Sequence, residues 1–189
     1  MRIIGGVRRG LHLADVGAGD PAAHLRPTSD RVREAIFNLI INGKAAATGN
    51  PVQGARVLDL FAGTGALGLE ALSRGALSVA FVETGVAAQA VLRANVAKMQ
   101  AARETRILRH DATRLPPRRD LAFTLVFLDP PYGKGMGEAA LKSALSGGWI
   151  APGALIVWEE NVLPLAPPGT TMVDQRRYGA TVVTLLRAG

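Results

Sequence analysis

Short apolar runs alternate with stretches of helical spacing along most of this chain. The apolar runs predict strands at 55–61, 77–83, 105–110, 122–129 and 153–159, and a closing pair of strands at 170–178 and 180–187. Between them, apolar residues recur at helical spacing over 65–74, 85–99 and 135–146. Strands that are apolar on both faces and alternate with helices are typical of a parallel sheet covered on each side. We therefore expect an α/β, Rossmann-like core that ends in an antiparallel hairpin.

The N-terminal part of the chain does not follow this pattern and is expected to form an extension. Glycines punctuate residues 1–16, which predict a short β-hairpin. A helical pattern begins at Thr28, with Thr28 or Ser29 placed to cap the helix and Gly43 placed to end it. A linker of small residues then separates this extension from the core.

Length and composition favour one soluble domain. A chain of 189 residues with 48% hydrophobic content buries a sizeable core. We expect a single domain over 1–189, with the extension over 1–45 and the Rossmann-like core over 46–189. Cysteine is absent, which excludes disulfides and thiolate ligands, and we expect no metal site. The start lacks the apolar stretch of a signal peptide, and no apolar run approaches the roughly 20 residues of a membrane span, so we expect a cytoplasmic protein.

Positive charge is concentrated near the N-terminus. The formal net charge is +7, and arginine side chains match phosphate geometry and stack on bases. This composition favours a nucleic-acid partner over a merely solvated surface. We expect four arginines to contact this nucleic acid: Arg8, Arg9, Arg31 and Arg33. The last two lie at the start of the predicted helix, where phosphates or a cofactor carboxylate can reach them.

A glycine-rich turn follows the first predicted strand of the core. Gly63, Gly65 and Gly68 form a G-x-G-x-x-G pattern, in which glycine lets the backbone approach a ligand and lets helix pack on strand. Dinucleotide enzymes share this pattern, but Asp59 lies inside the strand before it. A carboxylate there repels a pyrophosphate and attracts the ammonium and sulfonium groups of S-adenosylmethionine, although it also suits hydrogen bonds to loop amides. We expect cofactor contacts from this segment: Asp59, Phe61, Ala62, Gly63 and Gly65.

Two further acids follow the next two predicted strands. Glu83 closes the second strand, where an acid can accept hydrogen bonds from both ribose hydroxyls of an adenosine cofactor. Asp111, with Ala112 beside it, follows the third strand and is placed to accept a hydrogen bond from the adenine amino group. Each acid alone is compatible with an ordinary strand-end cap. Because open α/β sheets bind ligands at the carboxyl ends of their strands, their joint occurrence favours a cofactor site.

The tetrapeptide Asp129-Pro130-Pro131-Tyr132 ends the fourth predicted strand. Two consecutive prolines interrupt regular structure, so an acid, a carbonyl and an aromatic ring project from a stiff edge. If Asp129 and the Pro130 carbonyl accept both hydrogens of a base amino group, its nitrogen can direct a lone pair at an electrophilic methyl group, while Tyr132 stacks on the base. A tight turn without catalytic function is the structural alternative.

Motifs along nearly the whole chain resemble those of bacterial 16S ribosomal RNA guanine-N2 methyltransferases. They are, in order, MRIIGG, LRPTSDRVREAIFNLI, DLFAGTGALGLEALSRGA, HDA and FLDPPY. The resemblance implies a class I methyltransferase fold with a seven-stranded sheet, S-adenosylmethionine as donor and one guanine of 16S rRNA as acceptor, within an assembled or assembling small subunit. It also implies that Arg26 and Thr28 help to enclose the methionine half of the cofactor. We expect the enzyme to be a monomer.

Two positions depart from the family pattern. Gly85 stands where the family usually has an acid two residues after the strand-ending glutamate, which predicts looser or backbone-mediated contacts to adenine. Residues 11–13 follow Gly10 where a basic residue is common, although Arg8 and Arg9 are available to replace it. Neither departure affects the residues expected to act in methyl transfer.

Three other functions remain open on the residues alone. An adenine-N6 DNA methyltransferase would use a very similar tetrapeptide, although such enzymes usually carry an extra target-recognition region for which this chain has no room. A nicotinamide-dependent oxidoreductase would explain the glycine turn and Glu83, but not Asp59 or Asp129. A non-enzymatic RNA-binding module would explain the charge alone.

Overall fold

A computed structural model describes residues 1–15 and 29–189. The strands are β1 (Arg56–Leu60), β2 (Ser78–Val82), β3 (Thr105–Leu108), β4 (Phe123–Leu128), β5 (Ile150–Glu160), β6 (Thr170–Tyr178) and β7 (Thr181–Ala188). The helices are α1 (Asp30–Asn42), α2 (Ala66–Ser73), α3 (Val86–Lys98) and α4 (Met136–Ser146). Three single 3-10 turns are η1 (Gly6–Arg8), η3 (Lys44–Ala46) and η4 (Ala112–Arg114).

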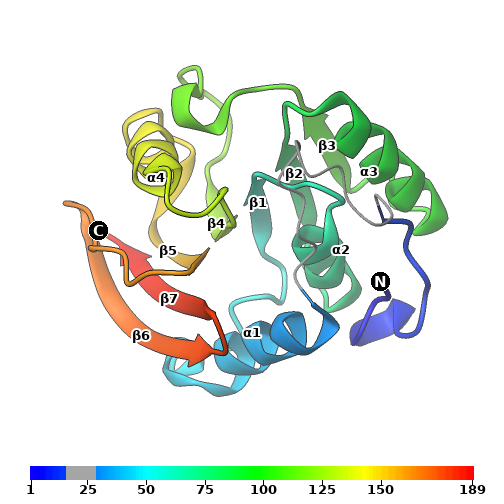
Figure 1. The fold of residues 1–189 in the computed structure, drawn as a ribbon, viewed down its shortest axis with the longest axis horizontal. Coiled ribbons are helices and arrows are strands. Elements are labelled where there is room, and N and C mark those ends of the chain that lie inside the picture. The colour runs from blue at the N-terminus through cyan, green and yellow to red at the C-terminus, as the bar shows by residue number, and fades with distance from the viewer. Residues whose placement is uncertain (16–28) are drawn as a thin grey trace.

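The strands form one sheet in the order β3-β2-β1-β4-β5-β7-β6 (Figure 1). Strands β1 to β5 run parallel, whereas β7 lies antiparallel to both β5 and β6. The predicted parallel core with an antiparallel terminal hairpin is therefore confirmed. Strand β5 begins at Ile150, earlier than predicted, and its register against β4 shifts between Ile150 and Leu155. Among the described residues, no helix is long and apolar enough to cross a membrane.

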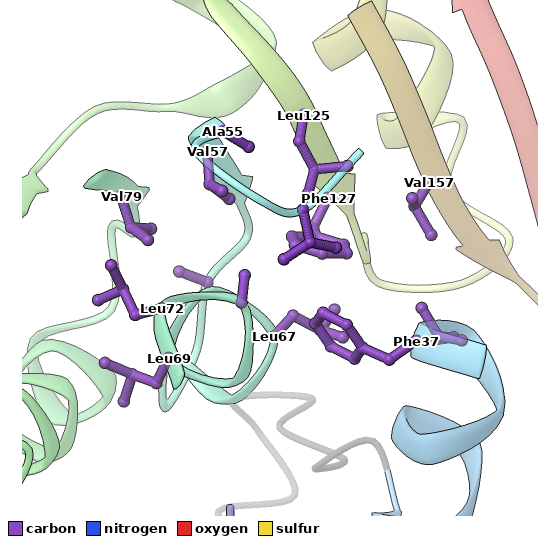
Figure 2. Close-up of a cluster of buried hydrophobic side chains, with 14 of the residues drawn as sticks. Phe37, Ala55, Val57, Leu67, Leu69, Leu72, Val79, Leu125, Phe127 and Val157 are labelled. Atoms are coloured by element: carbon purple, nitrogen blue, oxygen red, sulfur yellow. The ribbon is translucent and has the colours of Figure 1, made fainter. Parts of the chain in front are cut away.

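Helices cover the two faces of the sheet unequally. Helices α1, α2 and α3 lie on one face, and α4 with η4 covers the other (Figure 1). Side chains of β4 alternate between the two cores, with Phe127 on the first face and Val126 on the second, as the two-residue period of a strand requires. Figure 2 shows Phe37 of α1 and Leu67 of α2 meeting Phe127, and the two phenylalanine rings lie 5.6 Å apart. Helix α1 is thereby part of the main core.

The N-terminal segment is attached to the core through the buried carboxylate of Glu70 in α2. The backbone N–H groups of Ile4 and Gly5 each donate to Glu70 at 2.8 Å. Because these donors face α2 rather than an opposing strand, the expected β-hairpin is reduced to a single antiparallel bridge between Arg2 and His12, with η1 at its tip. The prediction of a hairpin was thus only partly right.

Two arginines complete the surroundings of Glu70. Its Oε1 atom lies 2.7 Å from Arg74 Nε, and its Oε2 atom lies 3.7 Å from Arg33 Nε. Arg33 is 0% exposed and also pairs with Asp30 at 2.8 Å and donates to the Arg2 carbonyl. A buried charge requires such partners because its desolvation is costly. The Arg33 side chain is therefore used inside the fold. The expected contact between Arg33 and an RNA phosphate is wrong, because the side chain is not exposed.

Substitution of Glu70 tests this attachment. Glu70→Ala leaves the buried Arg33, the partly buried Arg74 and two backbone donors without their acceptor, so we expect the free energy of unfolding to fall by about 3–5 kcal/mol. Urea unfolding followed by circular dichroism measures it. The exposed Glu34 of α1 provides a matched control, since Glu34→Ala should change stability by less than about 0.5 kcal/mol. Equal losses in both variants would contradict the anchoring role of Glu70.

Candidate active site

The predicted catalytic residues and the described cofactor-binding candidates follow strands at the edge of the sheet where β1 to β5 end, which we call the carboxyl edge. The last residue of β1, Leu60, pairs with Val82 at the end of β2 and with Leu128 at the end of β4. The segments that follow these strands therefore emerge side by side. The strand order reverses between β1 and β4, which is where open α/β sheets form a ligand crevice.

The glycine turn after β1 has a backbone that other residues could not adopt without strain. Gly65 caps α2 with a left-handed φ of 82°, and a Cβ there would overlap the Leu92 side chain. Gly68 lies so close to Phe81 and Asp59 that a side chain would separate α2 from the sheet. Phe61 also has a left-handed φ of 59°, which is uncommon outside glycine and concentrates at ligand sites.

Asp59 lies beneath this turn rather than on its surface. It is 2% exposed, and its Oδ2 atom accepts a hydrogen bond from the Gly68 N–H at 2.9 Å. Burial raises the pKa of Asp59 to about 8, although the Gly68 hydrogen bond opposes the shift, and the charge of Glu83 adds to it. The structure thus shows the loop-amide role that the sequence also allowed.

Glu83 connects the turn after β1 with the turn after β2. Its carboxylate accepts hydrogen bonds from the Gly63 N–H at 2.8 Å and from the Gly85 N–H at 2.7 Å. Gln89 of α3 donates to the Glu83 carbonyl at 2.7 Å. Gly85, which departs from the family pattern, thus positions Glu83 through its backbone. The carboxylate remains partly exposed at the carboxyl edge.

Asp111 lies beyond the end of β3 and caps η4. Its Oδ1 atom accepts from both the backbone N–H and the hydroxyl of Thr113, at 2.9 and 2.7 Å. These hydrogen bonds hold the pKa of Asp111 below its usual value. Ala112 beside it is buried in the core on the α4 side. The structure therefore shows the strand-end capping role, and the contact to adenine stays a prediction.

The tetrapeptide follows β4 directly. Asp129 is partly exposed and Pro130 is buried. The Tyr132 hydroxyl donates to Glu159 Oε1 at 3.0 Å. Burial, together with the carboxylates of Glu159 and Asp129, raises the pKa of Tyr132 above its usual value, so the hydroxyl remains a donor at neutral pH.

Glu159 is a site residue that we did not predict from the sequence. It is 4% exposed and comes one residue after Trp158, which pairs with Leu128. Asp129 and Glu159 therefore follow paired residues on neighbouring parallel strands and lie on the same face of the sheet. The signal was present, because Glu159 ends an apolar run just as Glu83 and Asp129 do.

The remaining predicted residues are divided between surface positions and the part of the chain outside the described residues. Arg26 and Thr28 lie outside the described residues. Arg8 is partly exposed, and Arg9 and Arg31 are exposed. Within residues 1–15 and 29–189, no group of three or more histidine, aspartate or glutamate side chains could hold a metal ion.

Comparisons with known proteins show which family this chain belongs to. The family model described as conserved hypothetical protein 95 matches residues 1–187. The ribosomal RNA small subunit methyltransferase D of Escherichia coli is 35% identical over 188 residues, covering 98% of this chain and 88% of that protein. A candidate rRNA methyltransferase of Bacillus subtilis, YlbH, is 33% identical over 193 residues, covering 99% and 98%. The solved structure of a candidate methyltransferase from Escherichia coli, yhhF, matches with a TM-score of 0.80 at 34% identity, covering 100% of this chain and 97% of that one.

The buried Asp59 predicts a specific pH dependence of stability. Its carboxyl group ionises near its ordinary pKa of about 3.9 in the unfolded chain, but stays protonated up to about 8 in the folded protein. Its contribution to stability is therefore fully present below about pH 4 and is lost as the pH rises toward 8. We expect the free energy of unfolding of the wild type to fall relative to that of Asp59→Asn between about pH 5 and pH 8.

Urea unfolding of both proteins at several pH values provides the measurement. Asparagine keeps an oxygen acceptor for Gly68 and resembles the protonated acid in shape, so the two proteins should be most alike in acid. Parallel stability curves across this range would show that Asp59 is already ionised in the folded protein.

Proposed function

This chain belongs to the conserved hypothetical protein 95 family and is related over nearly its whole length to a small-subunit ribosomal RNA methyltransferase D, and from that premise we propose that it methylates the exocyclic N2 amine of one guanine in 16S ribosomal RNA. The methyl donor is S-adenosylmethionine. The substrate is the RNA of an assembled or assembling small ribosomal subunit.

One observation carries the proposal: the glycine turn and the Asp129 tetrapeptide follow neighbouring strands. Leu60 and Leu128 are paired, so the segments that begin at Phe61 and Asp129 leave the sheet next to each other. An oxidoreductase needs the glycine turn but has no use for an acid followed by two prolines and a tyrosine. A methyltransferase needs both, because the donor and the acceptor amine must meet in a defined geometry.

The residues along the carboxyl edge fit S-adenosylmethionine. Glu83 is held by Gly63 and Gly85 with its carboxylate partly exposed, as a ribose-binding acid requires. Asp111 has a lowered pKa and remains a hydrogen-bond acceptor for an adenine amine. Asp59, protonated in the free protein up to about pH 8, would become a favourable carboxylate beside a cation. The bound donor supplies an electrophilic methyl group on sulfur. Arg26 and Thr28 remain proposed partners of its methionine half.

Asp129, Pro130 and Tyr132 are the proposed catalytic residues, with Pro131 completing the stiff edge. The Asp129 carboxylate and the Pro130 carbonyl accept the two hydrogens of the guanine N2 amine, which localises the nitrogen lone pair. Tyr132 stacks on the base, and its hydrogen bond to Glu159 fixes the position of the ring. Once methylated, the nitrogen is acidic, so its proton leaves without a strong general base. Orientation of this kind is worth an effective concentration of about 10⁵ M or more.

The named relatives and the lengths of the connections between core elements both favour RNA over DNA as the substrate. The Escherichia coli and Bacillus subtilis relatives named above are described as rRNA methyltransferases. Arg31 is exposed at the start of α1, so it remains a proposed phosphate contact. Adenine-N6 DNA methylation would require an additional recognition region, and the connections between the core elements of the described residues, of which 109–122 is the longest, are too short to form one.

Substitution of Asp129 tests the assignment. Because Asp129 is assigned to the acceptor base and not to the donor, we expect Asp129→Ala to lose methyl transfer to small-subunit RNA by at least about 10²-fold while keeping its affinity for S-adenosylmethionine. Transfer of a labelled methyl group measures the first quantity and calorimetry measures the second. The exposed Glu138 at the start of α4 provides a control, since Glu138→Ala should keep full activity.

Calorimetry with NAD separates the proposal from an oxidoreductase. Tight binding of NAD with no binding of S-adenosylmethionine would refute the function as a whole. Unchanged turnover of Asp129→Ala would refute only the role given to the tetrapeptide.

A further inference from the structure

An open groove of about 420 Å³ lies between the N-terminal turn η1 and the end of α3. We call it the basal groove. It is lined by the apolar residues Leu11 and Met99, the amide side chain of Gln100, and the cations Arg8, Arg9 and Lys98. No acidic residue lines it. The groove is therefore a positively charged hollow with a partly apolar floor.

The basal groove lies at the opposite end of the sheet from the proposed active site. Helices α2 and α3 begin at the carboxyl edge and return to the edge where the strands start, since β2 and β3 follow them. Arg8 contacts Ser73, the last residue of α2, and Lys98 is the last residue of α3. The eight residues of α2 separate Ser73 from the glycine turn by about 12 Å. A nucleotide bound at Asp129 does not fill this groove.

The cations of the basal groove are held on a rigid support. The Arg8 N–H donates to Ser73 Oγ at 3.0 Å, and the Ser73 hydroxyl donates to the Gly5 carbonyl at 2.6 Å. Gly6 has a left-handed φ of 75°, and a Cβ there would overlap the Ser73 carbonyl. The turn is thus fitted closely against the end of α2. Preorganisation of this kind lowers the entropy lost when a ligand binds.

Gln100 adds a second observation. It ends α3 in a left-handed conformation with a φ of 54°, at a position that normally favours glycine. The Gln100 N–H donates to the Ala97 carbonyl and the Ala101 N–H donates to the Val96 carbonyl, so these helix-end carbonyls are satisfied internally. These are the hydrogen bonds of an ordinary left-handed helix C-cap, so the Gln100 side chain is presented at the rim of the groove by a fixed backbone.

The charges of the groove are also free to meet a ligand. Among the described residues, no carboxylate lies within 4.0 Å of the side chains of Arg8, Arg9 or Lys98. Three such cations together match the repeating charges of a phosphate backbone better than a single anion. An amide at Gln100 can donate a further hydrogen bond to a phosphate oxygen.

We propose that the basal groove binds the phosphate backbone of a second RNA segment, away from the nucleotide that is methylated. The inference rests on the proposed function, because it takes RNA to be the substrate. The enzyme then holds its RNA at two ends of the sheet, and recognition depends on the folded shape of the RNA. A short single-stranded RNA occupies only the carboxyl edge.

A charge-neutral variant tests the proposal. We expect Arg8→Gln/Arg9→Gln/Lys98→Gln to raise the KM for small ribosomal subunits roughly tenfold or more while leaving kcat unchanged. In a plot of log affinity for deproteinised 16S rRNA against log salt concentration, the magnitude of the slope should fall by about 2 to 3. The variant Arg8→Lys/Arg9→Lys keeps the charges and should retain binding. Lys44, Arg119 and Lys142 are exposed cations outside the groove, so Lys44→Gln/Arg119→Gln/Lys142→Gln is the matched control.

Gln100→Gly separates binding from folding. Glycine relieves the left-handed conformation, so the thermal midpoint should stay equal or rise while affinity for 16S rRNA falls. A loss of affinity in this variant cannot be attributed to unfolding.

Each outcome decides the proposal. An unchanged KM and an unchanged salt slope in the triple variant would overturn it. If the triple variant lost binding to small subunits but kept full binding to deproteinised 16S rRNA, the proposal would also be overturned, because the groove would then contact a ribosomal protein. Absence of methyl transfer by the wild-type protein on any small-subunit RNA would instead refute the proposed function.

Discussion

The parallel direction of β1 to β5 is the constraint on which both binding surfaces depend. Because all five strands end at one edge, the acids and the glycine turn that follow them meet without any long connection. Because each helix must return to the opposite edge before the next strand begins, the ends of α2 and α3 meet there as well. One topology thus separates the proposed chemistry from the basal groove by the length of a helix.

The buried carboxylate of Glu70 links the N-terminal extension to this framework. Removal of a charge from water is costly, and the donors of Ile4, Gly5 and Arg74 together with the charge of Arg33 offset that cost for Glu70. The same network orders η1, so the stability of the core and the position of the arginines in the basal groove are coupled. Arg33 contributes to that coupling from inside the protein.

Local patterns predicted the fold well, whereas partners distant in the sequence were not predictable. Strand and helix positions follow from periodicity, and the order of acids after successive strands follows from the topology of parallel sheets. The burial of Arg33 depends on Glu70, which lies in another helix and has no local signal. Glu159 is tied to Tyr132 only through the register of β4 and β5. The placement of Arg8 beside Lys98 likewise required the docking of η1 on the core.

Mass mapping of modified nucleotides in 16S rRNA tests the central claim most directly. RNA from cells with the protein should contain one N2-methylguanosine that is missing from cells without it. Expression of the wild-type chain should restore that nucleotide, and Asp129→Ala should not. An identical set of modified nucleotides in both RNAs, or loss of N6-methyladenine from DNA in its place, would contradict the proposed function.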